Sequence, residues 1–419
     1  MVKKKKLTYH WVILLCGMII SASTTGILSY FGALFVEPVT ASLGVSKSTL
    51  MLYSTIGTIT TMIGSPIAGS LYKRFRVKTL MLVGIACGAG ALSCYAFSPN
   101  VYGFYLGGVL YGMAMCLSSG LPMTIIINNW FIEKRGTVTG IAYTGSALVS
   151  ALLSTTVSNI IANNGYSAGY QFLLTLFLVM MLPTTLFVLK VRPADMKMEP
   201  YGKAADPSGT QAKPDGFCKK EVMHTSAFWL FSVAVFLLGL ITFGTQNYLI
   251  ANWTSHGVDA GVAASMYSVV MIASAFSKLL LGGLYDKLGM GKGSAILCCM
   301  AVAAEVCLAT VTGGWGLLPS AILFGLMTSM QVLVTSYGVS RMFGQKDYSS
   351  LYGLECTFLF CGVSVGVYLT SVIFDITGSY RPAWWLYSVL MVVCMVCMLV
   401  SNRLSKKLYR EKLGMEREE

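Results

Sequence analysis

Long apolar runs separated by short polar turns make up almost the whole chain. Six of these runs precede a polar stretch and six follow it, at residues 10–36, 46–72, 78–97, 101–128, 137–162, 168–190, 226–251, 260–285, 293–312, 315–340, 347–373 and 380–402. Each holds about 20 residues or more, the length at which an α-helix crosses roughly 30 Å of hydrocarbon. The pattern predicts an all-α membrane protein with twelve transmembrane helices.

The polar stretch between the two sets of runs is rich in Lys, Asp, Gly and Pro and predicts a linker. The expected organisation is a six-helix half at 1–190, a cytoplasmic linker at 191–224, a second six-helix half at 225–402 and a basic cytoplasmic tail at 403–419. These boundaries follow the ends of the apolar runs.

The two halves carry an internal repeat. GSLYKRFRVK begins at Gly69 and GGLYDKLGMGK begins at Gly282, 213 residues apart, and each follows the second run of its half. Two parallel halves of this kind are typical of one large class of secondary transporters.

Composition and charge agree with a membrane protein. The chain is 55% hydrophobic and 11% charged, with a net charge of +13. The basic residues cluster between the apolar runs, as the positive-inside rule requires of cytoplasmic loops, so the charge predicts a lipid bilayer and no nucleic-acid partner. With a cytoplasmic N terminus, all but three of the 30 Lys and Arg fall inside; Lys47 and Arg381 lie outside and Lys278 lies within the membrane.

The chain offers no catalytic constellation. His10, His224 and His256 are far apart in the expected topology, and the C-x-x-C of Cys394 and Cys397 lies in an apolar helix without a neighbouring His or carboxylate. These cysteines are expected to pack as small apolar residues. We therefore expect no enzyme, no metal and no cofactor.

The second copy of the repeat contains Gly282, Leu284, Asp286, Lys287 and Gly289. It resembles the loop signature of the major facilitator superfamily. The resemblance implies that the glycines allow close helix approach, while the acidic and basic residues form a latch that gates conformational change.

The first copy departs from this signature. Lys73 stands at the position of the acidic residue and Arg76 at that of the final glycine. The resemblance therefore implies no standard charge latch in the first half.

Three further stretches are similar to the oxalate/formate antiporter branch of the facilitators, itself similar to the monocarboxylate porters. They are YFGALFVEPVTASLGVS at 30–46, NWFIEKRGTVTGIAYTG at 129–145 and EVMHTSAFW at 221–229. The resemblance covers essentially all twelve runs. It implies a gating role for Lys134 and Arg135, and transport of a small organic anion by alternating access, as antiport or proton symport.

Lys278 is the candidate substrate residue. It precedes Asp286 by eight residues, which places it about 12 Å into the membrane. Tyr267, Met271 and Ser274 share its helix face. A central cation costs at least about 2.5–3.5 kcal/mol, so it normally faces a partner or a cavity. A snorkelling or fixed, ion-paired lysine is the alternative; the resemblance, which places a basic residue here, favours carboxylate binding.

Other polar residues within the runs are weaker candidates. Glu355 is expected level with Lys278, where it neutralises the lysine or carries a coupling proton, or else bonds to Tyr or backbone groups. The role of Glu305 stays open between packing and coupling. Asn247 is a candidate for substrate contact or interhelical bonding, and the resemblance implies a pocket aromatic at Tyr30.

The eleventh run limits the charge of the substrate. The resemblance implies a second cation there in dicarboxylate-handling relatives, whereas LECTFLFCG at 354–362 contains none. We therefore expect a monocarboxylate or a larger monoanionic carboxylate, with a proton or counter-anion as second partner, in the plasma membrane of a bacterium. The alternatives are a multidrug or amphiphile exporter of the same fold and, disfavoured by the lack of a sizeable soluble domain, a non-transporting membrane sensor.

Overall fold

The computed structural model describes residues 2–45, 47–196, 198–202, 216–311 and 313–413. Nearly all of these residues are helical, so the expected all-α class is confirmed. Much of the expected linker and the end of the basic tail lie outside the described residues.

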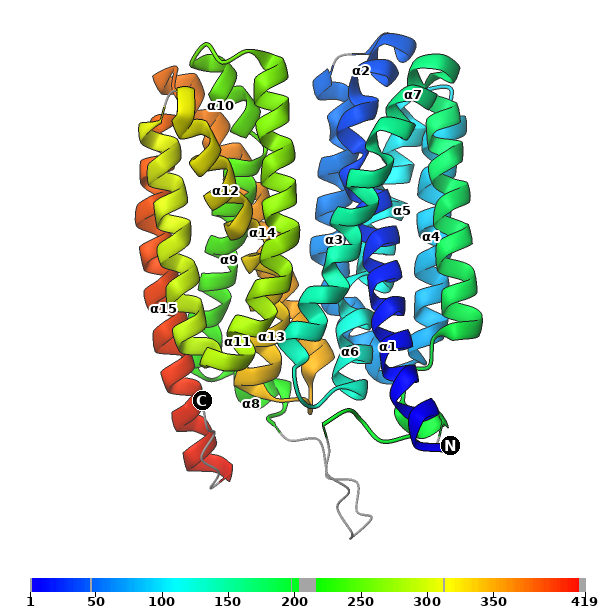
Figure 1. Cartoon of the computed structure of the whole chain (residues 1–419), viewed down its shortest axis with the longest axis vertical. Helices are drawn as coiled ribbons and strands as arrows, with labels where there is room; N and C mark the ends of the chain where they lie inside the picture. Colours follow the sequence, from blue (N-terminus) through cyan, green and yellow to red (C-terminus); the bar gives the residue numbers. More distant parts are fainter. Residues whose placement is uncertain (1, 46, 197, 203–215, 312, 414–419) are drawn as a thin grey trace. The chain divides into compact units, whose positions relative to one another are not determined.

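Contacts divide the chain into two compact units, the first spanning Met1–Gly209. Its helices are α1 (Val2–Ser21), the π-helix η1 (Ala22–Tyr30), α2 (Gly32–Leu43), α3 (Lys47–Arg74), α4 (Val77–Phe97), α5 (Val101–Ser118), α6 (Gly120–Trp130), α7 (Arg135–Pro183), η2 (Thr184–Val188) and η3 (Pro193–Met196). Within this unit α1 and η1 pack against α7, and α5 packs against α3 and α4 (Figure 1).

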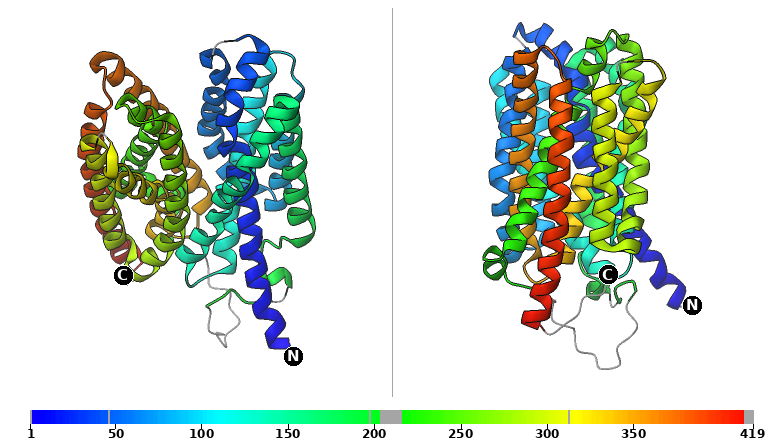
Figure 2. Two further views of the ribbon diagram at one scale, coloured as in Figure 1. Left: turned by 45° about the horizontal axis from the view of Figure 1, so that its top comes forward. Right: turned by 90° about the vertical axis from the view of Figure 1, so that its left-hand side faces the viewer.

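The second unit spans Thr210–Glu419. Its helices are α8 (Lys219–Met223), α9 (Ser226–Gln246), α10 (Leu249–Ser255), α11 (Ala260–Thr310), η4 (Gly314–Gly316), α12 (Leu317–Thr328), α13 (Met330–Phe343), α14 (Tyr348–Thr377) and α15 (Arg381–Leu413). Here α9 packs against α14 and α15, while α11 packs against α12 and α15. The right-hand view of Figure 2 shows α15 in red on the face turned toward the viewer.

Two long helices turn sharply at a glycine. α7 turns at Gly165 (φ 82°) and α11 at Gly289 (φ 72°), so each consists of two arms. Positive φ carries a steric penalty for residues with a Cβ, which explains the glycine at the end of the second repeat copy. In the first copy Arg76 has φ −68° and precedes α4 in extended backbone. The turn there needs no glycine, which accounts for the departure.

Ten helices within the described residues are long and apolar enough to cross a membrane. The expected runs 46–72 and 260–285 are not among them. α3 covers the first with 28 residues but mixes Ser, Thr and Gly with its apolar side chains, and in the second the apolar helix Ser265–Leu281 is shorter. The count of twelve and the direction of insertion stay predictions.

Glycines bring α9 and α14 into close contact. A Cβ on Gly362 would collide with the carbonyl oxygen of Phe236, and one on Gly366 with that of Leu240. Small residues allow helix backbones to approach in this way inside membranes. This tight crossing brings Glu355 of α14 next to Ser232 of α9.

Candidate functional site

Lys278 lies in the first arm of α11, and only 6% of its surface is exposed. The helix is continuous from Ala260 to the turn at Gly289, so Tyr267 and Ser274 share the face that carries Lys278, as predicted from their spacing. A cation at such a burial is costly unless its environment or a ligand compensates its charge.

Ser274 and Ser277, next to Lys278 on α11, fasten this arm to its neighbours. Thr328 donates a hydrogen bond to Oγ of Ser274 over 2.8 Å, and Ser329 donates to the Ser274 carbonyl over 2.9 Å. Ser277 donates to a carbonyl of α12 over 2.6 Å. The backbone that carries Lys278 is thus held by polar contacts to α12 and to the start of α13.

Gln246 and the predicted residue Asn247, at the end of α9, differ in exposure and contacts. Nε2 of Gln246 donates to the hydroxyl of Tyr267 over 3.3 Å, which ties the start of α11 to α9. Asn247 is exposed, and its Nδ2 donates to the carbonyl of Phe243 one turn earlier over 2.8 Å. This hydrogen bond joins Asn247 to the last turn of α9 and does not link two helices.

Glu355 lies on α14 and is fully buried. Its Oε1 accepts a hydrogen bond from Ser232 of α9 over 2.9 Å, while Oε2 has no hydrogen-bond partner among the described residues. The pairing of Glu355 with Lys278 stays a prediction.

Glu305 lies in the second arm of α11 and repeats this arrangement. It is fully buried, its Oε1 accepts a hydrogen bond from Thr245 over 2.8 Å, and Oε2 lacks a hydrogen-bond partner within the described part of the chain. α9 thus supplies one hydroxyl to each of two buried carboxyl groups. These pairs escaped prediction because they depend on how the helices cross.

Arg135 is the first residue of α7, and Lys134 directly precedes it. Arg135 Nε donates to the carbonyl of Phe131 over 2.7 Å, and Nη2 donates to that of Asn128 over 3.5 Å. A cation there complements the negative end of α6. Lys134 is exposed, with φ 55°. The gating role of both stays a prediction.

The predicted second gating loop is part of α11. Gly282 lies in the helix, Asp286 and Lys287 are exposed near the end of the first arm, and Gly289 forms the turn. The positive φ at the turn explains why position 289 is a glycine. The latch role of Asp286 and Lys287 stays a prediction.

The stretch 129–145 also packs the first unit. Trp130 is fully buried, and its Nε1 donates to the carbonyl of Lys190 over 2.8 Å. A Cβ on Gly145 would collide with the carbonyl of Met18 in α1. Part of this motif therefore holds helices together.

Tyr30 belongs to the first unit and ends the π-helix η1, with 38% of its surface exposed. The preceding residue, Ser29, has its Oγ 2.9 Å from the hydroxyl of Tyr111 on α5. π-helical turns are rare and frequent at functional sites. Helix periodicity in the sequence gave no signal of this segment.

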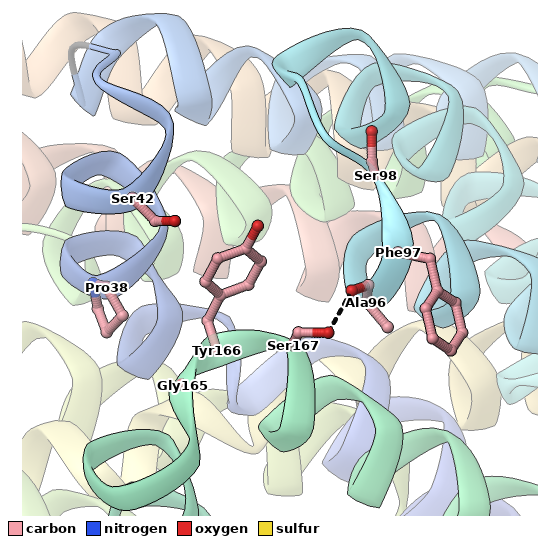
Figure 3. A pocket seen from close by; sticks show the side chains of 8 residues that line it. All are labelled: Pro38, Ser42, Ala96, Phe97, Ser98, Gly165, Tyr166 and Ser167. Carbon is pink, nitrogen blue, oxygen red and sulfur yellow. Dashed lines mark hydrogen bonds between the residues drawn. The ribbon is translucent and has the colours of Figure 1, made fainter.

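A hollow of about 490 Å³ lies within the first unit, near the turn of α7 (Figure 3). It is lined by Pro38, Ser42, Ala96, Phe97, Ser98, Gly165, Tyr166 and Ser167. Ser167 Oγ donates to the Ala96 carbonyl over 2.6 Å, and the Tyr166 ring lies between Ser42 and Ser98. These eight lining residues include no charged side chain and none of the predicted site residues.

The two helical units, with ten helices long and apolar enough to span a bilayer among the described residues, are those of a multi-pass membrane protein. The family described as Major Facilitator Superfamily matches residues 13–314 and 240–415. The chain belongs to this superfamily, whose members are multi-pass membrane transporters rather than enzymes.

Curated relatives share low identity over most of the chain. The MFS-type transporter pynF of Aspergillus niger is 22% identical over 86% of this chain and 79% of its own length. Monocarboxylate transporter 4 of Mus musculus is 22% identical over 80% and 71%. The oxalate:formate antiporter of Oxalobacter formigenes is 23% identical over 69% and 66%.

Solved structures share the fold. The transporter FucP aligns with a TM-score of 0.69 at 12% identity, covering 93% of this chain and 98% of that one. The human organic anion transporter MFSD10 aligns with a TM-score of 0.65 at 13% identity, covering 94% and 99%.

Proposed function

We propose that this transporter moves a small organic anion, a monocarboxylate or a larger monoanionic carboxylate, by alternating access. The anion moves in exchange for another anion or together with a proton. One observation carries this proposal: Lys278 places a cation that is only 6% exposed within the apolar helical segment Ser265–Leu281. A bound carboxylate would compensate this charge through a charge-assisted hydrogen bond.

The internal repeat argues against a purely structural lysine. Lys278 lies four residues before Gly282, and Ser65 lies at the matching place four residues before Gly69. Ser65 is also buried, and its hydroxyl donates to the carbonyl of Thr61 over 2.7 Å. Since the first unit packs with an uncharged residue at the matching position, helix packing alone does not require a lysine there.

The relatives support carboxylates as the substrate class. Two of them are named for monocarboxylate transport and for oxalate:formate exchange. The stretch 354–362 carries Glu355 and no Lys or Arg. One lysine balances one carboxylate, so a monoanion suits this site better than a dianion.

The remaining residues complete the proposal. Tyr267, Ser274, Asn247 and Tyr30 supply uncharged contacts to the anion. Glu355 neutralises Lys278 in the empty state or carries the coupled proton. The exposed pairs Asp286 and Lys287, and Lys134 and Arg135, gate the change of conformation.

Counterflow in proteoliposomes tests the substrate class. Liposomes loaded with one unlabelled compound are assayed for uptake of its labelled form, over monocarboxylates, dicarboxylates and cationic amphiphiles. We expect counterflow with monoanions and little with dianions. Counterflow restricted to cationic amphiphiles would favour the exporter function instead, and an imposed pH gradient separates proton symport from exchange.

A further inference from the structure

A second buried polar cluster of the second unit lies around Glu305. It contains Glu305 on α11, Thr245 on α9, Thr370 on α14 and Tyr387 on α15, and all four residues are fully buried. We call it the Glu305 cluster. Figure 1 shows the four helices that contribute to it. None of these residues belongs to the anion site proposed above.

Hydrogen bonds hold most of this cluster in place. Thr245 donates to Oε1 of Glu305 over 2.8 Å. The hydroxyls of Thr370 and Tyr387 lie 2.6 Å apart, and Thr370 also donates to the carbonyl of Gly244 over 3.1 Å. Gly244 directly precedes Thr245 in α9, so the hydroxyl pair lies beside the residue that bonds to Glu305. The site is thus built by side chains from four helices.

One atom of the cluster is left unsatisfied. Oε2 of Glu305 is buried and has no hydrogen-bond partner among the described residues. An ionised carboxylate would therefore place a full charge in a fully buried site with one hydrogen bond, from Thr245. Burying a charge without a counter-charge is far more costly than burying a neutral acid. The surroundings favour the protonated form.

The helices that contact α11 offer few groups to offset a negative charge. α10 and α12 contain no Asp, Glu, Lys, Arg, His, Tyr or Cys, and neither does α9, which supplies Thr245. α13 carries Tyr337 and the exposed Arg341.

On α15, Tyr387 is the titratable member of the cluster. The cation of α15 nearest to Tyr387 in sequence is Arg381, which is exposed at the start of the helix. The charged residues of α14, Glu355 and Asp375, are both acidic.

We propose that Glu305 is a proton-binding site of this transporter. In the conformation described here Oε2 carries the proton. A change of conformation that lets water reach the junction of α9, α11 and α15 allows the proton to exchange. The carboxylate then takes a proton from hydronium, and the neutral acid gives its proton back to water. Proton binding itself is independent of the substrate. Its link to transport rests on the proposed function.

Glu355 is the natural comparison for this site. Each glutamate accepts a hydroxyl hydrogen bond from α9, Glu355 from Ser232 and Glu305 from Thr245. The two hydroxyl residues are thirteen positions apart, about 20 Å along the helix. A single substitution can therefore change the surroundings of one glutamate without changing those of the other.

Infrared difference spectroscopy of the full-length protein in liposomes, recorded against pH, tests proton binding directly. Glu305→Gln is expected to remove one protonated-carboxyl C=O band, and Thr245→Val to shift the frequency of that same band because its hydrogen bond is lost. Glu355→Gln is the matched control and leaves that band in place. An unchanged band in Glu305→Gln overturns the proposal. If Glu305→Gln does not fold, an unchanged C=O band frequency in Thr245→Val overturns the proposal instead.

Anion exchange measured against pH provides the second readout. Glu305→Gln is expected to keep exchange at one pH but to lose most of its dependence on pH. If wild-type protein moves no organic anion, the proposed function fails while the infrared band still decides the proton site. If anions move and Glu305→Gln keeps the wild-type pH profile, the link of Glu305 to transport is wrong.

Discussion

Ser232 of α9 donates a hydrogen bond to Oε1 of Glu355 on α14, with 2.9 Å between the two oxygens. The bond lies in the helix pair that Gly362 and Gly366 bring into close contact. A buried carboxyl group is thus held by a neighbouring helix in the unit that carries Lys278.

Replacing Ser232 by Ala is expected to destabilise the second unit. The change leaves a buried carboxyl oxygen without its donor, which costs about 1–3 kcal/mol. Thermal unfolding in detergent measures this as a lower Tm. Ser364→Ala is the control, because the exposed Ser364 bonds to its own helix, at the carbonyl of Phe360. Equal Tm values for both variants would contradict the importance of the Ser232 bond.

Gly362→Ala is expected to push α9 and α14 apart. The new Cβ would collide with the carbonyl of Phe236, and overpacking of this kind typically costs about 1–3 kcal/mol. The measurement is again Tm, with expression of folded protein. Gly313→Ala is the matched control, because a Cβ at Gly313 meets no described atom within 4 Å. A Gly362→Ala protein as stable as this control would show that the crossing tolerates a larger separation.

The positive φ at Gly289 predicts that substitution by Ala lowers thermal stability in the second repeat copy but not at the matching position of the first. Gly289→Ala places a Cβ at φ 72°, which costs about 1–2 kcal/mol, whereas Arg76→Ala acts at φ −68°, where any residue fits. Thermal unfolding should show a lower Tm for Gly289→Ala and little change for Arg76→Ala. A lower Tm for Arg76→Ala than for Gly289→Ala would mean that the backbone turn does not require the glycine.

Glu355→Gln tests the coupling role proposed for this acid. The amide keeps the shape and can still accept the hydrogen bond from Ser232, but it can neither neutralise Lys278 nor release a proton. Uptake driven by an imposed pH gradient should fall by about tenfold or more if Glu355 carries the coupled proton, while counterflow at equal pH continues. Gradient-driven uptake equal to that of the wild type would leave neutralisation of Lys278 as the remaining role.

The fold was predictable from the sequence because apolar run length and repeated loop residues are local signals. Lys278 was visible for the same reason, since a cation within an apolar run is conspicuous. The pairs Ser232–Glu355 and Thr245–Glu305 were not predictable, because each joins two helices that are far apart in the sequence. Ser274 was predicted as a substrate contact from its helix face, and only the structure revealed its bonds to Thr328 and Ser329.

The central claim is that Lys278 binds the carboxylate of the transported anion. Equilibrium binding of the monocarboxylate identified by counterflow, measured on purified protein, tests it most directly. Lys278→Ala should weaken binding by about tenfold to a hundredfold, as expected for loss of a charge-assisted hydrogen bond worth about 1.5–3 kcal/mol. Lys278→Arg should retain part of the affinity, and Lys407→Ala, at an exposed lysine on α15, should bind as the wild type does. Wild-type affinity in Lys278→Ala would contradict the account.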